Sequence, residues 1–313
     1  MEKVLITGGA GFIGANFVYR FLEAGYDVNL IEKRESNIWR LKNIKDKIKI
    51  NYIHLKDYNK LEKFILELKP QIILHLAAFG TYPRRQQELK EIIETNFVGT
   101  VNLVNACSKI KFKCFINAGS SSEYGRKDKP MRETDLLEPD NPYGVTKAAA
   151  AMYCRYMAKS LGLPIVTMRP FAVYGYFEEK ERLIPTIIKS CLTNTELELS
   201  SPNSVRDFIF IEDVIEAYLL VIKNIQKIKG EIFNLGTGKQ STIAQVVKMI
   251  KKITQSSANP QYGKVKPGQQ EPKNWVADTS KIKQFLNWQP RYDLKEGLKK
   301  DIEWFKKNPS FYK

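Results

Sequence analysis

Three polar side chains in the middle of the chain have the types and spacing needed for proton transfer at a carbinol or carbonyl carbon. Tyr143 and Lys147 are four positions apart, so on a helix they lie on the same face. A lysine ammonium beside a tyrosine lowers the pKa of the phenol, which makes the phenol usable as an acid or base near neutral pH. Ser120 follows an apolar run and could hydrogen-bond the same substrate oxygen. Tyr-x-x-x-Lys pairs also occur by chance, but here a serine cluster and a glycine turn lie upstream.

A glycine-rich turn near the start of the chain indicates a dinucleotide site. Gly8, Gly11 and Gly14 follow an apolar run at residues 3–7 and open a stretch with apolar residues at helical spacing. A pyrophosphate needs a tight turn without Cβ atoms and helix N–H groups that point at the anion. Glycine patterns alone are common, but the strand–turn–helix context makes this one specific. The residues predicted to contact the cofactor here are Gly8, Gly11, Phe12, Ile13 and Gly14.

Residues 32–34 give conflicting signals about the identity of that cofactor. Glu32 ends the second apolar run, where a carboxylate accepts hydrogen bonds from the adenosine ribose and favours NAD. Lys33 and Arg34 could instead pair with a 2′-phosphate and favour NADP, or could face solvent. The sequence therefore predicts NAD or NADP, bound at Glu32, Lys33 and Arg34.

The elements that must position these side chains alternate between apolar strands and amphipathic helices. This alternation predicts a Rossmann-type α/β fold, a doubly wound parallel sheet with right-handed crossovers. We expect a dinucleotide-binding domain at 1–170, to which 207–240 returns. From residue 171 the elements shorten and prolines become frequent, so a smaller α/β substrate-binding region is expected at 171–206 and 241–313. The predicted strands are Lys3–Thr7, Asp27–Glu32, Ile48–Ile53, Gln71–His75, Lys113–Ala118, Pro164–Arg169 and Ile232–Leu235, and the predicted helices are Phe12–Ala24, Leu61–Leu68, Ile92–Lys109 and Tyr143–Ser160.

Composition argues against several classes of protein. No apolar run approaches the roughly 20 residues that span a bilayer, and no charged-then-apolar leader precedes the first strand. A cytoplasmic protein with no membrane partner is therefore expected. The net charge of +16 comes from scattered lysines, which argues against a nucleic acid partner. With only His54 and His75 in the chain, a histidine triad or a histidine-rich metal site is close to excluded, and no metal is expected. The cysteines, expected to be buried thiols, are Cys107, Cys114, Cys154 and Cys191.

Further motifs follow one another along the chain: Leu76-Ala77-Ala78, Asn96 in Asn-Phe-Val-Gly-Thr, Ser120-Ser-Ser-Glu-Tyr-Gly125, Arg169-Pro-Phe-Ala-Val-Tyr-Gly175 and Arg206-Asp207-Phe208. With the glycine turn and the Tyr143/Lys147 pair, they resemble the extended short-chain dehydrogenases of the NAD-dependent epimerase/dehydratase family, which act on nucleotide sugars. The resemblance covers essentially the whole chain. It implies that Tyr143 is the acid/base, that Lys147 is its partner and holds the nicotinamide ribose, and that Ser120 orients the sugar oxygen.

The same resemblance implies roles for residues outside the catalytic group. Arg206 would contact a substrate phosphate, since a guanidinium fork matches a diphosphate. Helices around 92–109 and 143–160 would pair in a homodimer. The residues that would line the cofactor site are Leu76, Ala77, Ala78 and Asn96.

The reaction follows less directly from the motifs. Dehydratases of this type carry an Asp-Glu pair just after the catalytic Ser or Thr, whereas this chain has Ser121 and Ser122 there. Glu123 comes one position late and is expected to face away, so dehydration is disfavoured. Segments 36–41 and 206–213 look like the abequose and paratose synthase branch, whose members reduce a CDP-4-keto-dideoxyhexose. Ala172 stands where many epimerases carry an asparagine.

We therefore expect a 4-ketoreductase that acts on a nucleotide 4-keto-6-deoxyhexose, in deoxysugar biosynthesis for surface polysaccharide. The alternative is a 4-epimerase of the UDP-hexose type with tightly bound NAD. A non-catalytic NAD(P)-sensing module is more remote, because such proteins typically lose the tyrosine or lysine. Arg84 and Arg85, after the fourth strand, could hold phosphate or could face solvent. The predicted substrate contacts are Thr81, Ser121, Ser122, Arg206 and Lys266, the last in a Lys-Pro-Gly sequence that resembles a diphosphate-binding element.

Overall fold

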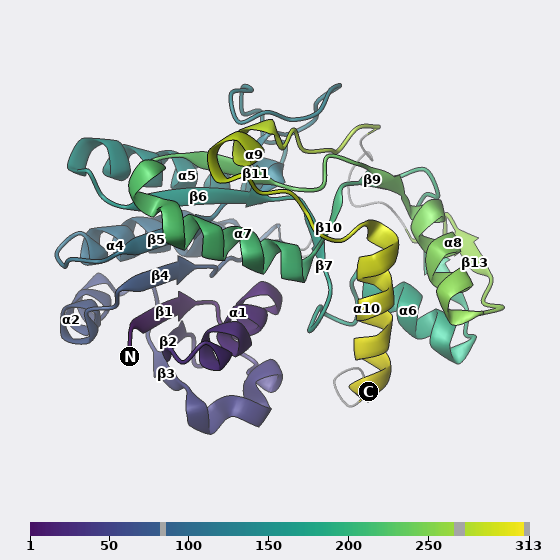
Figure 1. The fold of residues 1–313 in the computed structure, drawn as a ribbon, viewed down its shortest axis with the longest axis horizontal. Coiled ribbons are helices and arrows are strands. Elements are labelled where there is room, and N and C mark those ends of the chain that lie inside the picture. The colour runs from purple at the N-terminus through teal and green to yellow at the C-terminus, as the bar shows by residue number, and fades with distance from the viewer. Residues whose placement is uncertain (82–85, 266–272, 310–313) are drawn as a thin grey trace.

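A computed structural model of the chain describes residues 1–81, 86–265 and 273–309. Within these ranges, seven parallel strands form a central sheet in the order β11-β6-β5-β4-β1-β2-β3 (Figure 1). The parallel sheet confirms the predicted Rossmann-type fold. The strands are β1 (Lys3–Thr7), β2 (Asp27–Glu32), β3 (Lys49–Tyr52), β4 (Ile72–His75), β5 (Cys114–Ala118), β6 (Ile165–Pro170) and β11 (Ile232–Leu235).

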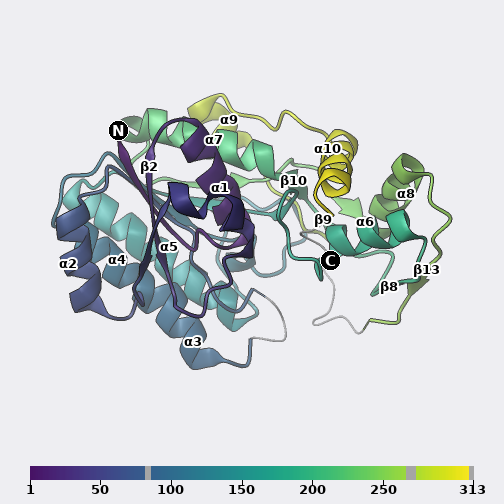
Figure 2. The same cartoon turned by 90° about the horizontal axis from the view of Figure 1, so that it is seen from below.

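Helices cover both faces of this sheet (Figure 2). One face carries α1 (Phe12–Glu23), α7 (Ile211–Asn224) and α9 (Ser280–Leu286), and the other carries α2 (Tyr58–Leu68), α4 (Gly99–Cys107) and α5 (Pro142–Leu161). Successive side chains of a strand point to opposite faces. Val4 and Ile6 accordingly join the core beneath α1 and α7, whereas Leu5 joins the core beneath α2 and α4. Burial on both faces explains why the strands have near-continuous apolar runs.

The predicted boundaries agree closely with those in the structure. Strands β1 and β2 begin and end as predicted, and the next four differ by one residue at one or both ends. The helix predicted for Ile92–Lys109 is less regular. It consists of α3 (Leu89–Ile93), a π-helical turn η3 (Glu94–Val98) and α4. Such π turns are frequent at functional sites, and this one contains Asn96.

The second half of the chain builds a smaller group of elements beside the sheet (Figure 1, right). Strand β11 nevertheless returns to the sheet and pairs with β6. Helix α9 also lies on the sheet beside β11 (Figure 1), although it comes from the segment 241–313. The elements outside the sheet and its layers are β7 (Ala172–Tyr174) paired with β10 (Phe208–Phe210), β8 (Leu197–Leu199) with β13 (Pro260–Tyr262), β9 (Val205–Arg206) with β12 (Ser241–Thr242), and the helices α6 (Leu183–Thr193), α8 (Ile243–Thr254) and α10 (Leu294–Lys307).

In the part of the chain that the structure describes, no helix is both long enough and apolar enough to cross a membrane. The four cysteines are buried and unpaired, as expected.

Candidate functional site

The glycine turn between β1 and α1 has the shape that a pyrophosphate requires. Gly8 has a φ of +70°, which favours glycine. A Cβ atom on Gly14 would lie 2.1 Å from the carbonyl oxygen of Gly8, so only glycine lets the first turn of α1 pack this closely. The N-terminal N–H groups of α1 therefore open at the turn, where helix ends favour anions.

Glu32 supports this turn from the end of β2. Its carboxylate accepts a hydrogen bond from the Ala10 N–H over 2.8 Å, and burial raises its pKa. Lys33 pairs with Glu91 and lies 5.6 Å from the ring centre of Phe79. Arg34 is exposed to solvent. Glu32, Lys33 and Glu91 all line the cavity beside the turn, where the charge of Lys33 is paired with Glu91.

Two cavities meet at this turn. The larger one, about 680 Å³, is lined by Glu32 and Lys33, and the smaller one, about 310 Å³, is lined by the proposed catalytic residues. Gly8, Gly11, Leu76 and Ala78 line both, so the two form a continuous space along the carboxyl ends of the strands. In doubly wound folds ligands bind at this edge.

Ser120, Tyr143 and Lys147 converge in the smaller cavity. Ser120 follows β5, while Tyr143 and Lys147 come from the first turns of α5. All three are buried, with Lys147 only 1% exposed. Burial lowers the pKa of Lys147, an effect that the nearby Glu123 carboxylate opposes.

The expected lowering of the tyrosine pKa is wrong for this structure. Burial raises the pKa of Tyr143 to about 12, and the hydrogen bond with the Ser120 side chain only partly opposes this effect. Desolvation of the phenolate outweighs the nearby positive charge of Arg182 because the ring is almost fully enclosed. A cation or hydrogen-bond donor placed in the cavity lowers the pKa of such a phenol.

Two fully buried polar residues, Asn96 and His75, lie behind the site, so Asn96 does not line the cavities as predicted. Asn96 fixes the turn after β4, because its side-chain amide accepts from the N–H of Phe79 and donates to the carbonyl of the same residue. His75 lies between the hydroxyls of Thr7 and Thr100, at 2.7 and 2.8 Å. Burial lowers the pKa of His75 to about 3, so it is a neutral structural residue.

Of the predicted substrate contacts, Thr81 lines the smaller cavity. The Ser121 hydroxyl accepts a hydrogen bond from the Trp275 indole at 3.2 Å, and the Ser122 N–H donates to Ser120 Oγ. Arg206 donates to the Val205 carbonyl and lies 5.9 Å from the Trp275 ring centre, so these three residues are not brought together with Thr81 in the cavity lining. The predictions for Arg84, Arg85 and Lys266 lie outside the described residues.

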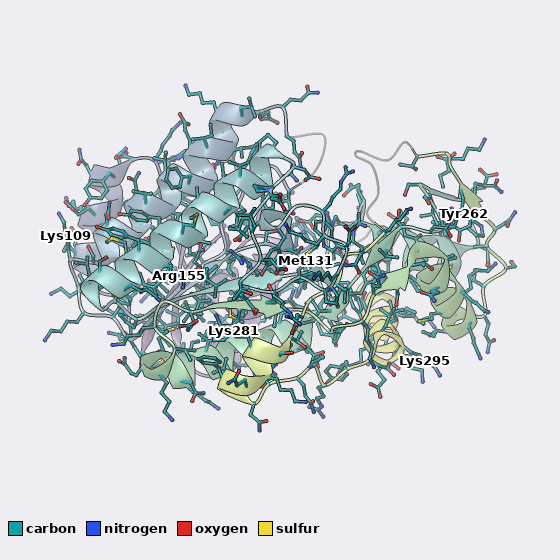
Figure 3. All side chains as sticks on the ribbon, turned by 90° about the horizontal axis from the view of Figure 1, so that it is seen from above. Lys109, Met131, Arg155, Tyr262, Lys281 and Lys295 are labelled. Carbon is teal, nitrogen blue, oxygen red and sulfur yellow. The ribbon has the colours of Figure 1, made fainter. Side chains whose placement is uncertain are left out.

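Sequence reasoning missed two charged residues that line the smaller cavity, Glu179 and Arg182. Both come from the loop between β7 and α6, directly after the Tyr174-Gly175 sequence. The concentration of charge at residues 178–182 was the available signal. Sequence reasoning also missed the segment that approaches Ser121 from the C-terminal region. In this segment Trp275 contacts Ser121, and Ala277 forms a β-bridge with Met131. Figure 3 shows Met131 between the large layered part and the smaller group of elements.

A family model described as "NAD dependent epimerase/dehydratase family" matches residues 4–236, which include the glycine turn and all three converging side chains. The chain belongs to this family. The predicted resemblance to its extended short-chain dehydrogenases is thereby confirmed, while the abequose and paratose synthase branch stays a prediction.

Individual members of the epimerase/dehydratase family match over nearly the whole chain. An uncharacterized UDP-glucose epimerase, YtcB of Bacillus subtilis, is 30% identical and the match covers 96% of this chain and 97% of the relative. A UDP-glucose 4-epimerase of Thermotoga maritima, solved with UDP-glucose, superposes with a TM-score of 0.89 at 29% identity over 98% of this chain and 99% of that one. A dTDP-glucose 4,6-dehydratase of Bacillus anthracis, solved with NAD, has a TM-score of 0.87 at 27% identity over 100% and 99%.

Proposed function

We propose that this chain is an NAD-dependent nucleotide-sugar 4-epimerase. The observation that carries the proposal is the meeting of Ser120, Tyr143 and Lys147 with the glycine turn in one cavity, where serines occupy the two positions after Ser120. This set supports oxidation and reduction at a carbinol carbon. It lacks the carboxylate pair that eliminates water in the related dehydratases.

The residues present fit a dinucleotide. The close packing of Gly14 on Gly8 leaves the pyrophosphate position open, and the continuous cavity has room for both halves of the cofactor. When bound, the nicotinamide ring supplies the acceptor and donor of hydride at C4 of the sugar. Lys147, which lines the smaller cavity, would hold the nicotinamide ribose.

Tyr143 and Ser120 handle the proton and the oxygen of the substrate. The Ser120 hydroxyl and Tyr143 together orient the C4 oxygen, and Tyr143 in its phenolate form accepts the C4 hydroxyl proton as the carbonyl forms. The keto-sugar then rotates in the cavity so that the opposite face of its C4 carbonyl is presented. The same phenol returns the proton to the C4 oxygen. Such a cycle needs a site that keeps its cofactor and consumes none.

Glu32 supports the choice of a recycled NAD. A buried carboxylate accepts hydrogen bonds from ribose hydroxyls and repels a 2′-phosphate, and the charge of Lys33 is balanced by Glu91 in the lining of the same cavity. The NAD in the Bacillus anthracis neighbour agrees with this assignment. A 4-ketoreductase of deoxysugar biosynthesis is the second candidate, favoured by Ala172 at the position where many epimerases carry asparagine.

The decisive experiment offers the purified protein two kinds of substrate. An epimerase converts UDP-glucose into its C4 epimer without added cofactor, which ¹H NMR of the anomeric region detects. A ketoreductase instead consumes NADH or NADPH with a nucleotide 4-keto-6-deoxyhexose, which lowers the absorbance at 340 nm. Stoichiometric loss of absorbance together with no epimerised UDP-hexose would overturn the epimerase assignment.

We also propose that two copies pair through α4 and α5, as predicted. On α5, the side chains of Val145, Met152 and Tyr156 are 51%, 64% and 60% exposed, beside Arg155 (Figure 3). Exposed apolar side chains grouped on one helix face are typical of an interface. Met152→Glu should convert a dimer into a monomer in sedimentation velocity, with Lys295→Glu, an exposed charge reversal on α10 away from this helix face, as the control.

We propose, in addition, the predicted division of labour along the chain. Residues 1–170 with 207–240 hold the cofactor, and 171–206 with 241–313 hold the nucleotide sugar. Glu179 and Arg182, which enter the cavity from the second group, support it. Substitutions at Arg182 should therefore raise the KM of the sugar nucleotide and leave the Kd of NAD within about twofold.

A further inference from the structure

Glu123 is a fully buried carboxylate for which the proposed reaction has no use. Its exposure is 0%, and its two oxygens have different partners. Oε1 accepts a hydrogen bond from the backbone N–H of Ser120 over 2.7 Å, and Oε2 accepts one from Nε of Arg169 over 2.6 Å. Glu123 thus faces away from the cavity, as expected from its position, yet contacts the backbone of a residue that lines it.

The local chain is built to accept this contact. Ser120 is extended, with φ −161° and ψ 147°, and begins the short helix η4 (Ser121–Glu123). Its Oγ accepts from the Ser122 N–H while its own N–H donates to Glu123, so side chain and backbone are both held. A Cβ atom on residue 119 would lie 2.5 Å from Glu123 Oε1, so glycine at position 119 is what lets the carboxylate reach the Ser120 N–H.

Arg169 is fixed in turn by a chain of buried hydrogen bonds. Its Nη1 donates to the Tyr124 hydroxyl over 3.0 Å, and that hydroxyl donates to Asn234 Oδ1 over 2.6 Å. The Asn234 amide donates to the Met131 carbonyl over 2.8 Å, in the segment that pairs with Ala277. A buried ion pair contributes little net stability compared with apolar residues of similar size. Stability alone therefore does not explain why the Glu123–Arg169 ion pair lies beside Ser120.

We propose that Glu123 is a positioning residue, which holds Ser120 through its backbone N–H so that the Ser120 hydroxyl meets Tyr143 and the substrate oxygen, with Arg169 holding the carboxylate in place. The inference rests on the proposed function, because it assigns Ser120 a place in the reaction. It goes beyond that function because neither Glu123 nor Arg169 touches the cavity. The contact acts on the geometry of Ser120, so its loss should lower kcat more than it changes KM.

Two matched double variants isolate the hydrogen bond to Ser120. Both carry Arg169→Met, so that no unpaired charge is buried in either. Glu123→Gln keeps a side-chain oxygen that accepts from the Ser120 N–H, and Glu123→Leu removes it. A misplacement of about 1 Å at a reacting group costs up to about 100-fold in rate. We therefore expect the E123L/R169M kcat to fall by about 10- to 100-fold with KM within about threefold, and the E123Q/R169M kcat to stay within about fivefold of wild type.

A second readout needs no substrate. In protein labelled with ¹⁵N-serine, the Ser120 amide is assigned by its loss in Ser120→Ala. Its hydrogen exchange should stay slow in E123Q/R169M and become at least about tenfold faster in E123L/R169M, since exchange requires the hydrogen bond to open. Gly119→Ala, whose Cβ displaces the carboxylate, should reproduce both effects if E123L/R169M does not fold.

Equal kcat values in the two double variants would overturn the proposal, whether both values match the wild type or both fall by the same factor. The hydrogen-bond acceptor at position 123 would then be irrelevant to turnover, whatever the amide exchange shows. Absence of epimerisation by the wild type would overturn only the proposed function. The role of Glu123 would then be decided by the ketoreductase rates of the same variants, measured at 340 nm, together with the hydrogen exchange of the Ser120 amide.

Discussion

Arg40 donates from Nε to the carbonyl oxygen of Phe177 over 2.7 Å, and this contact ties the start of the dinucleotide site to the loop that enters the catalytic cavity. The same guanidinium donates to the Ala10 carbonyl in the glycine turn over 3.2 Å. It also lies 2.8 Å from Glu179, which lines the cavity. Phe177 has a φ of +67°, a conformation that non-glycine residues rarely adopt. Arg40, 4% exposed, thus holds a strained loop against the cofactor turn.

Arg40→Met should therefore weaken binding of both NAD and the sugar nucleotide. Hydrogen bonds from a buried charged group are worth about 1.5–3 kcal/mol each, so about a tenfold rise in both the Kd of NAD and the KM of the sugar is expected. Isothermal titration calorimetry and steady-state kinetics measure the two. Arg20→Met is the control, since Arg20 pairs with Glu216 at the surface. A rise in only one of the two constants would show that Arg40 does not link the sites.

Tyr143→Phe should abolish turnover while the protein still binds its cofactor. Loss of the acid/base costs about 10²- to 10⁴-fold in kcat, and removal of one hydroxyl leaves the dinucleotide contacts at the glycine turn intact. Turnover is measured by NMR and NAD binding by tryptophan fluorescence. Tyr153→Phe on the same helix is the matched control, because the Tyr153 hydroxyl donates to Asn105 outside the cavity. Residual activity above a tenth of wild type would remove Tyr143 from the mechanism.

Gly14→Ala should prevent cofactor binding without unfolding the protein. The new methyl group would meet the Gly8 carbonyl at 2.1 Å, so the turn must move away from the helix end that faces the pyrophosphate. We expect the Kd of NAD to rise by at least about 100-fold, as phosphate binding at a helix N-terminus depends on this backbone placement. Gly162→Asn serves as control, because nothing lies within 4 Å of that position and Asn tolerates positive φ. Unchanged NAD affinity in Gly14→Ala would contradict the assigned pyrophosphate site.

Stability should fall as the pH rises through neutrality, because of two buried acids. Within the described residues, neither carboxylate oxygen of Asp301 has a hydrogen-bond partner. Burial raises the pKa of Asp301 from 3.8 to about 7 and the pKa of Glu178 from 4.5 to about 8. The folded state therefore keeps protons that the unfolded chain releases at lower pH. This stability is fully present below the unfolded-state values and is lost as the pH rises through 7 and 8.

Asp301→Asn removes one of these titrations and should flatten the pH dependence. The melting temperature of the wild type is expected to drop by at least about 2 °C more than that of Asp301→Asn between pH 6 and pH 8.5. Glu303→Gln, at an exposed position of the same helix, should behave like the wild type. Parallel melting curves for wild type and Asp301→Asn across this range would show that Asp301 is not the group that titrates.

The sheet and the convergence of Ser120, Tyr143 and Lys147 in one cavity could be predicted because local signals determine them. The strand–glycine–helix pattern at residue 8 is contiguous, and carboxyl ends of parallel strands meet at one edge wherever the strands are found. Tyr143 and Lys147 share a helix face by spacing alone. The location of Ser120 at the same edge of the sheet follows from its position just after β5.

The contacts that hold the site could not be predicted in the same way. Glu123 and Arg169 are 46 positions apart, and Arg40 and Phe177 are 137 apart, so their pairing depends on the packing of separate elements. The high pKa of Tyr143 also follows from enclosure by the whole fold, which spacing on one helix does not reveal. The pairing of Lys33 with Glu91, on a different element 58 positions away, is likewise not visible in the local sequence.

Strand β11 pairs with β6, although residues 171–231 lie between them in the chain. On the ribosome, β6 emerges first, and its outer row of N–H and C=O groups stays unpaired until residues 232–235 follow. At a synthesis rate of about 5–20 residues per second, this interval lasts for several seconds. An unpaired, apolar strand edge is a template for pairing with other chains. Nascent chains that stall between the two strands are therefore expected to be substrates for chaperones. The order in which the sheet is completed thus affects the fraction of newly made chains that fold instead of aggregating.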